Sequence, residues 1–223
     1  MKSSKAISVL LAIVLAVFAL SASIAVPILF RSFYYAQIDS LALPEQTGWS
    51  KDVIRQAYDE VMDYLVFGAP FGTGSLRSSA DGQAHFADCR ALFRLDFILL
   101  GVSTILLIAL TVWRRRRKTT FYHLCGHSAV FWAAAGLSAI FLLVALWAVI
   151  DFSSLFTAFH HAFFPGKTNW VFDWRTDEII LILPEAFWMR TGAFVLVLCL
   201  GGLWITAFAV WAACRWRKKL RIL

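Results

Sequence analysis

The sequence lacks the short motifs that mark several common chemistries. It contains no glycine-rich phosphate-binding loop, no HExxH zinc motif and no Gly-x-Ser-x-Gly nucleophile elbow. Nothing in it therefore indicates a P-loop NTPase, a zinc protease or a serine lipase of the usual kind. Its four cysteines form no CxxC pair, which argues against a thiol oxidase.

Charged residues are also scarce. Only 16% of the 223 residues are charged, 60% are hydrophobic, and the mean hydropathy is +0.71. These values are typical of a polytopic membrane protein. Four continuously apolar stretches are each close to the ~20 residues that a helix needs to cross a bilayer core, and they do not alternate as barrel strands would. The stretches lie at about residues 6–30, 97–113, 129–150 and 192–214.

The distribution of charge predicts an orientation. The N-terminus, the link after the second stretch and the C-terminal tail together hold twelve cations and no acid. The long loops 31–94 and 151–191 hold nine cations and thirteen acids. By the positive-inside rule, both termini are cytoplasmic and both long loops lie outside. The net charge of +7 thus reflects topology and contact with membrane lipids, and no basic patch with stacking aromatics indicates a nucleic-acid partner.

The first apolar stretch resembles a cleavable export signal at its start. Lys2 and Lys5 precede an apolar run that reaches the small residues Ser21-Ala22-Ser23. The run continues to Phe30, however, and at about 24 residues it is long enough to span the membrane. We therefore expect this stretch to be retained, in a chain that forms a single membrane domain over residues 1–223.

The first long loop predicts one amphipathic helix. Residues 31–49 are expected to be irregular, and Ser50 is a suitable N-cap. Apolar residues then recur at three- and four-residue spacing from Val53 to Leu65, which predicts about four helical turns ended by Gly68-Ala69-Pro70. The segment 71–82 is rich in glycine and serine and predicts a turn-filled excursion, with a hairpin as one form.

Histidines in the two long loops are the candidates for chemistry, because histidine moves protons near neutral pH. His85 is expected to lie on a helix that leads into the second span. Asp88 would then share its face and could orient its imidazole. His160 lies in an aromatic stripe at helical spacing that Pro165-Gly166 ends, and residues 169–174 predict a short strand or an aromatic turn.

The expected fold is therefore an all-α membrane protein. Four transmembrane helices would be joined by two extracytoplasmic loops, which form a small outer cap of one amphipathic helix and short β or turn segments. His123 and His127 have zinc-like spacing but lack cysteine or carboxylate company, so we expect them to be interfacial. Asp96, at the head of the second span, fits either a buried functional carboxylate or a side chain that snorkels.

The loops also carry an ordered set of motifs. They are Tyr58-x-x-Val61-Met62-x-Tyr64-Leu65, His85-Phe86-x-Asp88, Phe159-His160-x-x-Phe163-Phe164, Asn169-x-x-Phe172-Asp173-x-x-x-Asp177 and Pro184-Glu185-x-Phe187. In these motifs and in its four-helix layout the chain resembles the lipoprotein intramolecular transacylase (Lit) family over nearly its whole length.

The resemblance implies an activity and a place. Family enzymes act on diacylglyceryl lipoproteins at the outer leaflet of the bacterial cytoplasmic membrane. They move the sn-2 acyl chain to the amine of the N-terminal cysteine and give the lyso-form lipoprotein. The resemblance puts His85 and His160 in the catalytic positions, as base and as acid or oxyanion donor in either order, with no cofactor and no metal. Supporting or substrate-binding candidates are Asp88, Tyr58, Tyr64, His161, Asn169, Trp170 and Asp173.

Two other functions fit the same sequence. In one, the protein is not an enzyme and its outer loops bind a partner, so that replacing His85 and His160 would have no effect. In the other, it is an acyltransferase or esterase that acts on free lipids. Both predict unchanged lipoprotein N-termini. An enzyme of either kind requires the two imidazoles to lie within reach of one reacting group.

Overall fold

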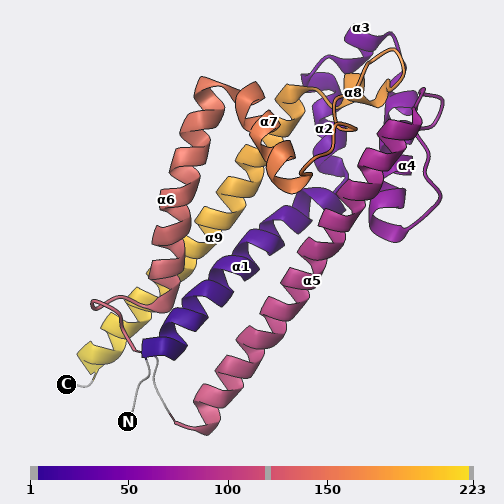
Figure 1. The fold of residues 1–223 in the computed structure, drawn as a ribbon. Coiled ribbons are helices and arrows are strands. Elements are labelled where there is room, and N and C mark those ends of the chain that lie inside the picture. Colours follow the sequence, from indigo (N-terminus) through magenta and orange to yellow (C-terminus); the bar gives the residue numbers. More distant parts are fainter. Residues whose placement is uncertain (1–4, 119–121, 221–223) are drawn as a thin grey trace. The chain divides into compact units, whose positions relative to one another are not determined.

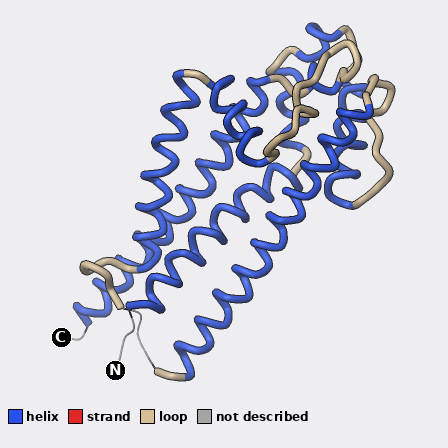
Figure 2. The backbone as a smooth tube through the Cα atoms, in the orientation of Figure 1, coloured by secondary structure: helices blue, strands red, loops and turns tan. Residues whose placement is uncertain are grey.

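The computed structural model describes residues 5–118 and 122–220, with side chains up to residue 216. The described residues form helices and turns and contain no strand, as Figure 2 shows. This confirms the predicted all-α fold, including its four helices that are long and apolar enough to cross a membrane. The helices, labelled in Figure 1, are α1 (Lys5–Leu29), α2 (Ser32–Ser40), α3 (Leu43–Thr47), α4 (Lys51–Phe67), α5 (Ala80–Arg116), α6 (Ala129–Ile150), α7 (Phe152–Phe163), α8 (Ile179–Ile182) and α9 (Glu185–Leu220).

The chain forms two compact units. The first, here called the membrane-helix unit, comprises Met1–Ile24, Phe97–Leu143 and Phe194–Leu223. The second, here called the loop unit, comprises Ala25–Asp96 and Val144–Ala193.

The four candidate spans expose their side chains. Only 6% to 22% of the most apolar window of α1, α5, α6 and α9 is buried inside the protein, as expected of helices whose side chains face lipid. Two of these helices extend beyond the apolar stretches that predict the spans. Helix α5 begins at Ala80, which confirms the helix predicted to lead from His85 into the second span, and α9 begins at Glu185 rather than near residue 192. Both extensions are more polar than the apolar windows from which the spans were predicted.

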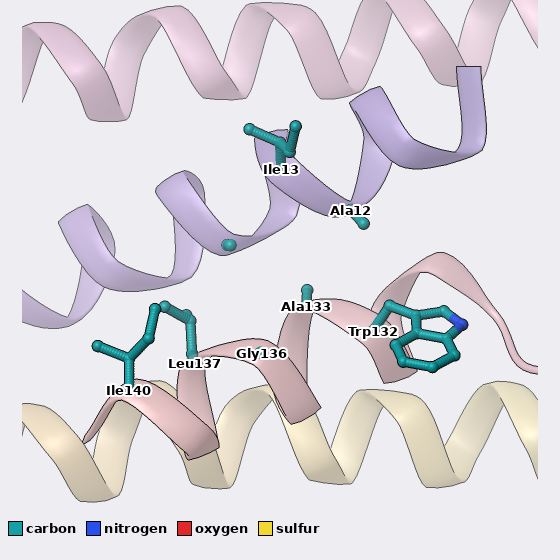
Figure 3. A pocket seen from close by; sticks show the side chains of 8 residues that line it. Ala12, Ile13, Trp132, Ala133, Gly136, Leu137 and Ile140 are labelled. Carbon is teal, nitrogen blue, oxygen red and sulfur yellow. The ribbon is translucent and has the colours of Figure 1, made fainter. Parts of the chain in front are cut away.

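Within the membrane-helix unit, small side chains let helices approach closely. Ala133 and Ala134 of α6 are buried with Cys199 and Leu203 of α9, and Ala16 of α1 packs against this cluster. Small residues at helix contacts are typical of membrane proteins. An open apolar pocket of about 210 Å³ lies between α1 and α6 and is shown in Figure 3; it is lined by Ala12, Ile13, Ala16, Trp132, Ala133, Gly136, Leu137 and Ile140.

The amphipathic helix of the loop unit is α4, and its ends are those that the sequence predicts. The Ser50 side chain accepts a hydrogen bond from the backbone N–H of Val53, and Gly68 ends the helix at a positive φ of 78°. One face is buried through Ile54, Ala57, Tyr58, Val61, Met62 and Leu65.

The prediction that residues 31–49 are irregular is wrong. They form α2 and α3, because Tyr34 and Ile38, one turn apart on α2, both find apolar partners and are 0% and 1% exposed. Tyr34 stacks on Tyr58 with ring centroids 3.8 Å apart, and its hydroxyl donates to the carbonyl of Ile182 at 2.9 Å. These contacts come from distant segments, so local sequence gives no sign of them.

The remaining loop segments are held by side chains rather than by strands. Residues 169–174 form turns, which excludes the strand alternative, and no hairpin forms in residues 71–79. Instead, the Ser79 backbone N–H and hydroxyl both donate to the Asp177 carboxylate at 2.8 Å. Arg77 pairs with Glu178 next to them. A side chain at Gly82 would clash with Asp177, so glycine is required where α5 begins.

Candidate active site

Two histidines from distant segments meet inside the loop unit. His85 lies in the first turns of α5, ahead of its apolar part, and His160 lies near the end of α7. Their ring centroids are 5.6 Å apart and their planes are inclined by 34°. The side chains are only 7% and 6% exposed. At this separation one small group can lie within hydrogen-bond distance of both rings.

The tautomer of His160 is fixed by its own helix. Its Nδ1 lies 2.7 Å from the carbonyl oxygen of Phe156, and because that oxygen can only accept, Nδ1 carries the proton. The lone pair is therefore on Nε2. Trp170 stacks on the ring at 4.6 Å and 28°. Burial lowers the pKa of His160 below its ordinary value, although the Phe156 carbonyl works in the opposite direction.

His85 has a more apolar environment. Phe164 and Phe172 meet its ring edge-to-face at 5.1 and 5.4 Å. Its Nε2 lies 3.4 Å from the sulfur of Cys89, one turn along α5. Within the part of the chain that the structure describes, its Nδ1 is buried without a hydrogen-bond partner. Burial, reinforced by the nearby His160, lowers the pKa of His85 to about 4.

The two imidazoles are therefore both uncharged at neutral pH. A proton on one ring disfavours a proton on the other, because the two like charges would lie close together in a site with little water. Such a pair can accept one proton and at the same time donate a hydrogen bond from its second member. This is what a reaction needs when one reactant loses a proton while negative charge develops on another.

The sequence led us to expect that Asp88 orients the imidazole of His85. In the structure its carboxylate has other partners. Its carboxylate accepts hydrogen bonds from Lys167 and, at 3.1 Å, from the side-chain amide of Asn169. Burial works to raise the pKa of Asp88, but these two donors outweigh it and hold the pKa below its ordinary value. An ionised carboxylate accepts a hydrogen bond from a charged ammonium group in preference to one from a neutral imidazole.

The other candidate residues lie at different depths. His161 is exposed and meets Trp170 edge-to-face at 5.6 Å. Tyr64 packs on Phe71, whose ring in turn lies 5.7 Å from Phe86, the neighbour of His85. The candidates Tyr58 and Asp173 make their contacts with residues other than the two histidines. Tyr58 belongs to the stack with Tyr34, and Asp173 is exposed and accepts from the Arg175 backbone N–H.

Among the described residues, no three His, Cys, Asp or Glu side chains are placed to hold an ion. His127 stacks on Phe131 with centroids 4.0 Å apart, which accounts for it as a packing residue. Asp96 is 8% exposed, which does not fit a carboxylate that snorkels into water.

Comparison with known proteins identifies the family. The sequence model of the family described as lipoprotein intramolecular transacylase Lit matches residues 9–188. The chain belongs to this family. It is therefore an acyltransferase of the lipoprotein intramolecular transacylase family. No curated protein sequence matches the chain.

Solved structures of one Lit protein share the fold. The chain is similar to the membrane-integral lipoprotein intramolecular transacylase Lit from Bacillus cereus, at 23% identity and a TM-score of 0.83 over 97% of both chains. A structure of that protein with one histidine replaced by arginine matches at 21% identity and a TM-score of 0.80, over 97% of this chain and 94% of the other. A third, with a histidine replaced by alanine, matches at 23% and 0.79. This likeness supports a multi-pass membrane protein.

Several residues around the histidines of this Lit member were not singled out by its sequence. Cys89 could have been found, because it lies four residues after His85 and hence one helical turn away. Lys167 gives no such signal, since 79 residues separate it from Asp88. Phe164 and Phe172 do belong to the family motifs, but their contact with His85 arises only through the tertiary fold.

Proposed function

We propose that this transacylase moves the sn-2 acyl chain of a diacylglyceryl lipoprotein to the amine of its N-terminal cysteine. The product is the lyso-form lipoprotein, with one acyl chain on nitrogen and one on the glyceryl group. Family membership supports the lipoprotein substrate. The observation that carries the proposal is the buried pair of imidazoles, His85 and His160, with ring centroids 5.6 Å apart.

His160 is the general base in this mechanism. Its Nε2 lone pair takes a proton from the amine as the amine nitrogen attacks the ester carbonyl. The charge that forms on the ring is stabilised through Nδ1–H, which donates to Phe156 at 2.7 Å. His85 donates an N–H to the oxyanion that develops on the carbonyl oxygen. The C–N bond forms, the bond to the sn-2 oxygen breaks, and the proton held by His160 passes to that oxygen.

No nucleophilic side chain of the enzyme takes part. Cys89 is the thiol closest to hand, but burial raises its pKa to about 12, so it remains a thiol and is a poor nucleophile. The reaction does not require one, because the amine and the ester belong to the same substrate molecule. Holding both in one site supplies the proximity that a bimolecular reaction lacks, which is worth several kcal/mol.

The substrate's location follows from the charge pattern. Twelve cations and no acids flank the spans at the termini and the central link. We infer that these segments face the cytoplasm and that the histidine pair works at the outer face of the bacterial inner membrane. Lipid-anchored substrates would reach the site from the outer leaflet.

Tandem mass spectrometry of a lipoprotein's N-terminal peptide tests the proposal. The host makes only diacylglyceryl lipoproteins and expresses the parent chain, His85→Ala, His160→Ala or, as a neighbouring control, His161→Ala. Intramolecular transfer leaves the mass unchanged, so the fragment with acyl on the amine is decisive. We expect the N-acyl fragment with the parent and with His161→Ala, and not with His85→Ala or His160→Ala. A well-expressed parent that yields only the diacylglyceryl form would favour free lipids as substrates.

A further inference from the structure

A three-residue contact joins the start of α5 to the segment after α7. Asp88, one turn beyond His85, accepts from the Lys167 ammonium and from the Asn169 amide. The Asp88 side chain is 21% exposed and that of Lys167 48%. Because the Asp88 carboxylate can only accept, the Asn169 amide nitrogen must be the atom that faces it. We call these three residues the clasp.

The clasp holds a segment with no regular structure of its own. Residues 164–178 form turns and bends, so their position depends on such contacts rather than on a helix or a ladder. The Trp170 indole N–H donates to the Lys167 carbonyl at 3.0 Å, which ties the middle of the segment to the clasp. Lys167 is in turn anchored through its backbone N–H to the carbonyl of Phe164.

The segment that the clasp holds covers both histidines. Trp170 stacks on His160 with centroids 4.6 Å apart and planes inclined by 28°. Two residues on, Phe172 meets His85 edge-to-face at 5.4 Å. The two histidines are only 7% and 6% exposed, and Trp170 and Phe172 supply part of the contacts that shield them. If the segment moved away, water would reach the rings.

Water would change the product as well as the rate. In transfer, the acyl carbon forms its new bond to the amine nitrogen. In hydrolysis, a water oxygen forms that bond, the bond to the sn-2 oxygen breaks, and the water proton passes through the base to that oxygen. Hydrolysis would release a free fatty acid and leave the N-terminal amine unmodified. Exclusion of water from the site prevents this side reaction.

We propose that Asp88 is a positioning residue that, through Lys167 and Asn169, holds Trp170 and Phe172 over the histidine pair and so directs the acyl group to the amine rather than to water. This inference rests on the proposed function. It assigns Asp88 no contact with the substrate. Its distinctive consequence is a change in the ratio of two products.

The first test measures that ratio. Purified parent, Asp88→Ala and Lys167→Ala are incubated with a diacylglyceryl lipopeptide, and N-acyl product and released fatty acid are quantified together. We expect the ratio of fatty acid to N-acyl product to rise about tenfold in both variants. Asp39→Ala is the matched control, because Asp39 forms an exposed ion pair with Lys51 in the same unit. The charge swap D88K/K167D should recover part of the parent ratio.

A second test reads the segment directly and does not depend on activity. Hydrogen exchange of peptides covering residues 165–176 is followed in detergent micelles. We expect exchange about tenfold faster in Asp88→Ala than in the parent or Asp39→Ala, and slower again in the swap. An unchanged exchange rate, or an unchanged product ratio in variants that lose rate, would overturn the proposal. A parent that makes no N-acyl product would instead overturn the proposed function, and exchange would still decide the clasp.

Discussion

The two units of the molecule use their apolar residues in opposite ways. In the membrane-helix unit, large apolar side chains point outward, with Ile105 and Ile205 67% and 72% exposed. In the loop unit, residues of the same kind point inward, and Leu43, Ile54 and Ile182 are fully buried. The first arrangement needs lipid as its solvent, whereas the second makes a core of the kind found in water-soluble domains.

The polar groups differ in the same way. The loop unit joins its segments with ion pairs and hydrogen bonds over long sequence separations, such as Arg31 with Asp59 and Asp63. The membrane-helix unit joins its helices with small side chains and few polar contacts, such as the Trp204 indole N–H that donates to Ser138. The two buried histidines, and the Phe156 carbonyl that fixes the tautomer of His160, all belong to the loop unit. We therefore propose that the chemistry takes place in the loop unit.

The largest difference in the free energy of unfolding is expected between truncating a buried side chain of the loop unit and truncating an exposed side chain of the membrane-helix unit. Ile54→Ala, in the core of the loop unit, should lower the free energy of unfolding by about 2–5 kcal/mol because it leaves a cavity. Ile205→Ala should cost less than about 1 kcal/mol, because its side chain faces lipid. Denaturant titration in micelles measures both. Equal losses would show that the two units are packed alike.

Replacing an exposed apolar residue by lysine should have different effects in the two units. Ile105 at the middle of a span and Val171 in the loop unit are 67% and 66% exposed. Ile105→Lys should oppose membrane insertion by about 3 kcal/mol, whereas Val171→Lys should stay within about 0.5 kcal/mol of the parent. The fraction of each chain that resists alkaline extraction from membranes gives the answer. Full insertion of Ile105→Lys would contradict a lipid-facing side chain.

Acid should weaken the loop unit through His85. Its pKa is about 4 in the folded state and ~6.5 when unfolded. Between these values the unfolded state binds more protons, so stability falls as the pH drops below about 6.5. From pH 7.5 to 5.5 we expect a loss of roughly 1 kcal/mol from this residue. Thermal denaturation is followed against pH for the parent, His85→Gln and the control Ile205→Ala. The loss of stability assigned to His85 should be present in the parent and in Ile205→Ala, and absent from His85→Gln.

The smallest expected effect concerns the start of α4. Ser50→Ala removes the acceptor for the Val53 backbone N–H and should lower the free energy of unfolding by about 1 kcal/mol, whereas Ser50→Gly should cost a few tenths. Both values come from the same micelle titrations. If the two variants lose equal stability, the Ser50 side chain does not cap the helix.

The sequence predicts the elements whose signal is local. The four spans, the cap at Ser50 and the stop at Gly68 are each recognised from runs and spacings within one segment. Helices α2 and α3 were missed because what stabilises them, such as the Tyr34 stack on Tyr58, comes from distant residues. A helix too short to be stable alone depends on such tertiary contacts.

In the candidate site, too, the sequence predicts what depends on local signals and misses what depends on distant contacts. His85 and His160 could both be named as histidines of the outer loops that match the family motifs, and His160 also stands out in an aromatic stripe at helical spacing. The partners of Asp88 could not be named, because Lys167 and Asn169 lie 79 and 81 residues away. The fixed tautomer of His160 depends on a carbonyl that only the helix geometry of α7 brings to 2.7 Å.

The central claim is that the two histidines act as one unit in acyl transfer. The most direct measurement is kcat/KM for N-acylation of a diacylglyceryl lipopeptide by the parent, His85→Ala, His160→Ala and the double variant. We predict that each single variant loses at least about a hundredfold and that the double variant loses little more, because a base without its oxyanion donor is already disabled. Retained activity in either single variant, or losses that multiply in the double variant, would contradict the account.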